Sequence, residues 1–167
     1  MCARLPTVRA LLLSQNLIGE PPAVAWSSLG ELLDLDLSDN RLSSLPSDGL
    51  RALRSLRVLR LARQRGPKGE RILTELPDAL GGLPRLEELC LAGIRFGAEG
   101  MQALAEGLGS GALPSLPYLR LRVNHIGEAG ASALGAVLCR GALPRPLKLR
   151  SRSWRRSSCL LYTSPSP

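Results

Sequence analysis

The chain has 167 residues, which is room for a single domain, and a formal net charge of +8 at pH 7. Leucine makes up roughly a fifth of it, far above average usage, while aromatic residues are only 3%. This balance favours a core of stacked aliphatic side chains over an aromatic-lined cofactor pocket, and no apolar run reaches the roughly 18 residues that a membrane-spanning helix requires. The basic excess is concentrated in residues 141–167, which contain six basic residues and no acidic one.

A leucine-rich pattern first occurs at Val8, and copies of it follow along the chain. The clearest copy runs from Leu32 to Leu42 and reads L-x-x-L-x-L-x-x-N-x-L. Each L-x-L alternation predicts a short strand with one buried face, and the recurrence predicts a solenoid of stacked parallel strands joined by return segments. The ninth position of successive copies is occupied by Asn16, Asn40, Gln64, Ile94 and Asn124, separated by 24, 24, 30 and 30 residues.

The ninth-position asparagine is expected to bind backbone groups where the chain leaves the strand, so that successive asparagines form a ladder. Gln64 can substitute in part, although its longer side chain is expected to fit less well, and Ile94 cannot form a side-chain hydrogen bond. We therefore predict a local irregularity of backbone pairing in the middle of the solenoid, beside the polar loop at Arg65–Arg71. The alternative is ordinary drift between repeats.

The return segments change character along the chain. The early ones open on Leu45-Pro46 and Leu76-Pro77. After the fourth copy, residues 98–108 and 128–138 are rich in alanine, leucine and glycine, and they predict two short amphipathic helices.

The second of these segments also carries a recognisable motif. Asn124 opens the sequence N-H-I-G-E-A-G-A, which is followed by Ala133-Leu134. It resembles the N-x-I-G-x-x-G-A-x-A-L motif of the ribonuclease-inhibitor class of leucine-rich repeats, which also occurs in NOD-like receptors. On this resemblance residues 86–149 are similar to that class, and residues 5–85 to the shorter typical class.

The resemblance implies an α/β fold. We expect a curved leucine-rich repeat solenoid with a parallel concave sheet of about five short strands and helical or irregular return segments. It implies no particular activity, because these repeats serve many unrelated proteins.

Side chains between the buried strand leucines are expected to point to the concave surface, where an acidic repeat lies beside a basic one. One interpretation is a set of cross-strand ion pairs, and the other is a charged patch that selects a complementary partner. The last repeat is the best candidate for a binding hot spot, because tyrosine and arginine are enriched at such sites. The candidate partner-binding residues are Asp34, Asp36, Asp39, Arg60, Arg63, Glu88, Tyr118, Arg120 and Arg122.

Residues able to carry catalysis are sparse. The single histidine is His125, and the four cysteines have no C-x-x-C spacing, which disfavours a zinc site and indicates reduced thiols in a cytoplasmic protein. The glycines at 66 and 69 lack the spacing of a phosphate-binding loop. We therefore expect a non-enzymatic cytoplasmic chain without cofactor, metal or small-molecule substrate.

The ends of the chain depart from the repeat pattern. Residues 1–149 are predicted to form the repeat domain, and we expect a fragment of a longer array because neither end has a polar cap. Residues 150–167 predict a basic, disordered tail, whose last residues resemble translated cloning or sequencing-adapter sequence. Two functions stay open: binding of an unknown protein partner on the concave face, or contact of the tail with nucleic acid or an anionic membrane.

Overall fold

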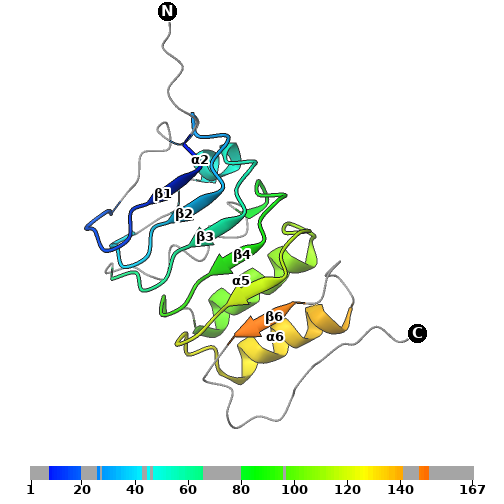
Figure 1. The fold of residues 1–167 in the computed structure, drawn as a ribbon. Helices are drawn as coiled ribbons and strands as arrows, with labels where there is room; N and C mark the ends of the chain where they lie inside the picture. Colours follow the sequence, from blue (N-terminus) through cyan, green and yellow to red (C-terminus); the bar gives the residue numbers. More distant parts are fainter. Residues whose placement is uncertain are drawn as a thin grey trace, which may run out of the picture.

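The structure is a computed structural model that describes residues 8–19, 26, 28–42, 45, 47–65, 80–95, 97–140 and 147–150. Within these residues a single six-stranded sheet contains the strands in chain order, from blue β1 to orange β6 (Figure 1). We call each strand with its return segment a rung. The strands are β1 (Ala10–Leu12), β2 (Asp34–Asp36), β3 (Val58–Arg60), β4 (Glu88–Cys90), β5 (Tyr118–Arg120) and β6 (Lys148–Arg150).

The strand register follows the leucine pattern. All pairs are parallel, and the central residue of each strand is a leucine that lies opposite the central leucine of the next strand. The predicted parallel sheet is therefore confirmed. The last strand is additional to those predicted, and it ends at Arg150, which the sequence pattern placed in the tail. Backbone pairing needs only extended geometry, so β6 pairs although the leucine pattern is lost after Leu149. Residues 151–167 of the tail lie outside the described part of the chain.

The leucines of the pattern build the core between the sheet and the return segments. Leu35, Leu59 and Leu89, at the strand centres, are at most 1% exposed. Leu50 and Leu104, from return segments, are equally buried. Burying each side chain contributes on the order of 1.5–3 kcal/mol. The leucine spacing therefore determines which side of each strand faces inward.

The helices of the described residues lie on one side of the sheet (Figure 1). They are α2 (Ser47–Ala52), α5 (Gly97–Gly109) and α6 (Gly127–Cys139). The two helices predicted after the fourth copy are confirmed as α5 and α6, which pack against each other. A Cβ atom at Gly130 would lie 2.9 Å from Cβ of Met101, so this glycine permits the close approach of α5 and α6. None of the described helices is long and apolar enough to cross a membrane.

Each of the first five strands leads into a turn with one left-handed residue. This residue stands just before the ninth position, and its φ lies between 54° and 68° in Gln15, Asp39, Arg63, Gly93 and Val123. The fourth and fifth rungs add a second such residue just after the ninth position, with φ of 57° and 50°. The turns of the two halves of the chain therefore differ, in line with the change from short to helical return segments.

The ninth-position asparagine joins neighbouring rungs as predicted. Nδ2 of Asn40 donates hydrogen bonds to the carbonyl oxygens of Leu13 and Leu37, at 2.8 and 2.9 Å. Oδ1 of Asn40 accepts a hydrogen bond from the backbone N–H of Ile18 at 3.1 Å. One buried amide thus satisfies backbone groups of two rungs.

Gln64 makes the same set of contacts one rung further on. Its Nε2 donates to the carbonyl oxygens of Leu37 and Leu61, at 2.8 and 3.1 Å, and its Oε1 accepts from the N–H of Leu42 at 3.2 Å. The prediction that Gln64 can take the place of asparagine is confirmed, with hydrogen bonds to Leu61 and Leu42 slightly longer than the 2.9 and 3.1 Å of the equivalent Asn40 contacts. The extra methylene is accommodated while the amide stays at the position that Asn40 occupies in its own rung.

The predicted irregularity in the middle of the solenoid is wrong for the strand pairing. Strands β3 and β4 pair in register, and backbone hydrogen bonds continue beyond them on both sides. Ile94 is 1% exposed, and its backbone N–H donates to Oδ1 of Asn124 at 2.9 Å. Because Ile94 has no side-chain amide, the ladder of side-chain hydrogen bonds does not continue from its rung to the previous one. The backbone pairing between the two rungs is nevertheless undisturbed. Most of the polar loop predicted at Arg65–Arg71 lies outside the described residues.

Candidate functional site

Side chains that flank the central strand leucines project from the side of the sheet opposite the helices. We call this surface the sheet face. The central leucines of β2 to β5 are buried, whereas the flanking side chains are partly exposed in β2, β3 and β4 and exposed in β5. Within the strands, the sheet face consists of Ala10, Leu12, Asp34, Asp36, Val58, Arg60, Glu88, Cys90, Tyr118, Arg120 and Lys148.

The first ion pair on the sheet face runs diagonally between strands. Arg60 lies opposite Asp36 in the strand register, yet its guanidinium binds the carboxylate of Asp34 at 2.7 Å. The carboxylate of Asp36 instead accepts a hydrogen bond from the backbone N–H of Ser38 at 2.9 Å. Burial lowers the pKa of Arg60, but the hydrogen bond and the charge of Asp34 outweigh it, so that the pKa is raised.

Arg120 repeats this diagonal geometry. It lies opposite Cys90 but binds the carboxylate of Glu88 at 3.1 Å. At the turns, Arg63 binds Asp39 at 2.6 Å, and this hydrogen bond and charge raise the pKa of Arg63. The interpretation as cross-strand ion pairs is thus confirmed for Asp34 with Arg60 and for Asp39 with Arg63, whereas Asp36 binds the backbone of Ser38. The pair between Glu88 and Arg120 is additional to that interpretation.

The β5–β6 end of the sheet face is different. Tyr118 is 44% exposed, and Nζ of Lys148 lies 5.1 Å from the centroid of its ring and donates to its hydroxyl oxygen at 3.5 Å. Arg122 follows inward-facing Leu121, so strand alternation directs it to the same side as Arg120. It forms no ion pair with any described residue. Sequence reasoning missed Lys148, although it stands one 30-residue period after Tyr118, and that period is the signal that could have found it.

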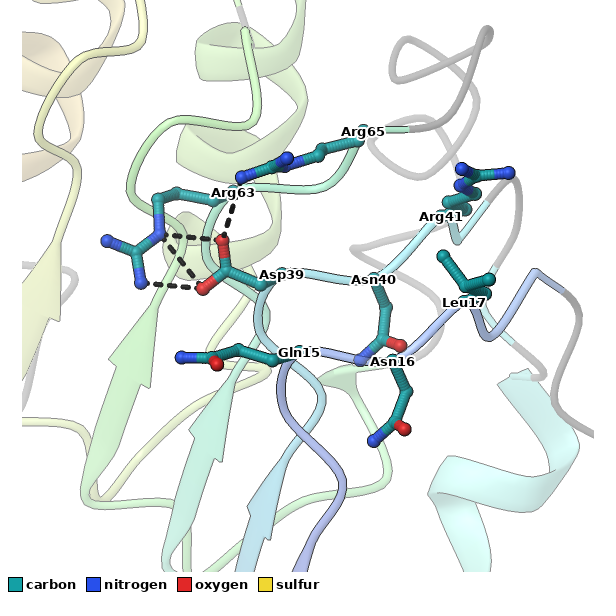
Figure 2. A pocket seen from close by; sticks show the side chains of 8 residues that line it. All are labelled: Gln15, Asn16, Leu17, Asp39, Asn40, Arg41, Arg63 and Arg65. Atoms are coloured by element: carbon teal, nitrogen blue, oxygen red, sulfur yellow. Dashed lines mark hydrogen bonds and ion pairs between the residues drawn. The ribbon is translucent and has the colours of Figure 1, made fainter.

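A hollow lies beside the sheet face, at the turns of the first three rungs, with a volume of about 520 Å³. Figure 2 shows the carboxylate of Asp39 directed at Arg63, with Arg65 above it and Arg41 and Leu17 on the other side. Two guanidinium groups, of Arg63 and Arg65, lie 2.6 and 3.9 Å from this carboxylate. Across the described residues, no group of three histidine, cysteine or acidic side chains could hold a metal ion.

Comparison with known proteins agrees with the stacked leucines and the amide ladder. A family model for the leucine-rich repeat matches residues 5–65. The described chain has the leucine-rich repeat fold. Among solved structures it is similar to an internalin from Listeria monocytogenes, with a TM-score of 0.53 and 18% sequence identity over 86% of this chain and 34% of that chain. The chain thus spans about a third of the length of the internalin, and the likeness concerns the fold. No curated protein matches the chain.

Proposed function

We propose that the chain is a non-catalytic protein-interaction module whose partner binds the sheet face. Leucine-rich repeat proteins generally mediate protein–protein interactions and are typically non-enzymatic scaffolds. The observation that carries the proposal is the contrast between the two sides of each strand. The central residue is leucine in every strand, whereas the flanking residues change in size and charge from rung to rung. A rigid scaffold that presents a different side chain on each rung is suited to recognising a protein by shape and charge.

The distribution of charge supports this use of the face. In its middle, Arg60 and Asp34 neutralise each other while remaining about 30% exposed, so they can stay solvated at the rim of an interface. Toward β5, exposed Tyr118 offers a large side chain with little conformational entropy to lose. The sheet face thus combines a neutral area with a potential anchor.

The test starts with affinity capture using the whole chain as bait, followed by binding measurements on the purified partner. Val58→Arg places a long charged side chain on the sheet face, and Gln102→Arg places the same side chain on the exposed side of α5. We expect Val58→Arg to weaken binding by about tenfold or more and Gln102→Arg to leave it within about twofold. Circular dichroism checks that both variants keep their secondary structure. Weakening by Gln102→Arg alone would contradict the proposal.

A further inference from the structure

The β5–β6 end of the sheet face can be compared with equivalent positions in the other rungs, because the chain repeats itself. The positions equivalent to Tyr118 hold Ala10, Asp34, Val58 and Glu88 in the earlier strands. Those equivalent to Arg122 hold only small residues, which are Ser14, Ser38, Ala62 and Ala92. Repeat structure alone therefore requires neither the aromatic ring nor the arginine. Both are additions to the surface of this rung.

Positive charge at this end is only partly compensated. Arg120, Arg122 and Lys148 are cationic, and the one carboxylate bound among them is that of Glu88. Two positive charges therefore remain without a carboxylate from the described residues. In the earlier rungs, by contrast, Arg60 and Arg63 each bind their own aspartate.

An apolar side chain adjoins these cations. Val123 is 63% exposed and has a φ of 59°, in the left-handed region that β-branched residues rarely adopt. Equivalent positions hold Gln15, Asp39, Arg63 and Gly93. This rung therefore presents an exposed apolar side chain on a strained backbone next to the cations.

The chemistry of this end fits a polypeptide better than a nucleic acid. A phosphodiester backbone needs cationic side chains along its whole path. The strands offer no such path, because Arg60 on β3 is already bound to Asp34 and Arg120 on β5 to Glu88. An acidic protein segment can place a few carboxylates against the local cations and apolar side chains against the tyrosine ring and the valine.

We propose that the β5–β6 end of the sheet face, formed by Tyr118, Arg120, Arg122, Val123 and Lys148, binds an acidic segment of the partner protein that also carries apolar side chains. This inference rests on the proposed function and adds the chemistry of the partner. Carboxylates of the segment bind Arg122 and Lys148, and its apolar side chains contact the ring of Tyr118. The ion pair with Glu88 holds Arg120 in place beside them.

The test uses fluorescence anisotropy with the whole chain and a fluorescein-labelled peptide of about eight residues that contains glutamate and leucine, long enough to cross three rungs when extended. A second peptide has glutamine in place of every glutamate. We expect the glutamate peptide to bind about tenfold or more tightly than the glutamine peptide, and the preference to fall as salt is added. Equal binding of the two peptides would overturn the inference.

Charge reversal identifies the position of the peptide. The double variant Arg122→Glu, Lys148→Glu should weaken binding of the glutamate peptide by about tenfold or more. The double variant Arg41→Glu, Arg54→Glu changes the net charge by the same amount at exposed positions away from this end, and it should leave binding within about twofold. Equal weakening by both variants would indicate attraction to net charge alone and overturn the inference. Tighter binding of a single-stranded oligonucleotide than of the glutamate peptide would overturn it in favour of nucleic acid.

The same variants separate the two proposals. If the captured partner depends on Val58 but binds the Arg122→Glu, Lys148→Glu variant with unchanged affinity, the acidic-segment inference fails and the proposed function stands. If the partner is indifferent to every sheet-face variant, the proposed function fails as well. Both proposals are supported if the Arg122→Glu, Lys148→Glu variant loses partner binding and the Arg41→Glu, Arg54→Glu variant keeps it.

Discussion

Replacing Gln64 with leucine should destabilise the chain, although the two side chains are similar in size and Gln64 lies outside the strands. The amide of Gln64 is 8% exposed and is the described partner of two backbone groups, the N–H of Leu42 and the carbonyl of Leu61. A third backbone group, the carbonyl of Leu37, keeps its hydrogen bond from Asn40. Leucine has nearly the same size but leaves two buried backbone groups without a partner.

The magnitude follows from these two groups. An unsatisfied buried donor or acceptor costs about 1–3 kcal/mol, and the apolar contacts of the new leucine offset part of it. We expect Gln64→Leu to lower the free energy of unfolding by about 2–4 kcal/mol. Gln64→Asn is the matched control, because Asn40 makes the same three contacts with the shorter side chain. It should stay within about 1 kcal/mol of the unaltered chain.

Urea unfolding followed by circular dichroism measures both variants, and amide hydrogen exchange at Leu42 provides the local readout. We expect the amide of Leu42 to exchange faster in Gln64→Leu than in Gln64→Asn, because only the first removes its acceptor. A Gln64→Leu variant as stable as the unaltered chain would refute the reasoning. So would a Gln64→Asn variant that is destabilised to the same extent as Gln64→Leu.

Three further substitutions test other parts of the structure by the same unfolding assay. Val123→Asn should raise the free energy of unfolding by about 1 kcal/mol, because asparagine tolerates the left-handed backbone at φ of 59°, and a loss of stability would contradict this. Gly130→Val should lower it by about 2–3 kcal/mol, because its Cβ would lie 2.9 Å from Cβ of Met101, and an unchanged stability would show that α5 and α6 can separate freely. Arg60→Ala should lower the free energy of unfolding by less than about 1 kcal/mol, because its ion pair with Asp34 is partly solvated. A larger loss would contradict this expectation.

The repeat architecture could be predicted from the sequence because one residue type decides it. Leu35, Leu59 and Leu89 recur at fixed offsets, and burying them on one side sets the faces and the register of the strands. The helices α5 and α6 followed from the same kind of periodic evidence. Such patterns are local, so that a single sequence is enough to recognise them.

What the sequence could not give depends on distances between side chains. Adjacent rungs of opposite charge predicted ion pairs, but not that Arg60 would bind Asp34 diagonally while Asp36 binds the backbone N–H of Ser38. The contacts of the Gln64 amide likewise depend on distances between rungs, which the sequence does not contain. Spatial neighbours such as Lys148 and Tyr118 become apparent only when the rungs are stacked.

Site-specific photo-crosslinking tests most directly the central claim that the partner binds the sheet face. A benzophenone amino acid replaces Tyr118 on the sheet face in one variant and Gln102 on the exposed side of α5 in another, and each variant is irradiated with the purified partner. We predict a covalent adduct from position 118 and none from position 102. An adduct from position 102 without one from position 118 would contradict the account.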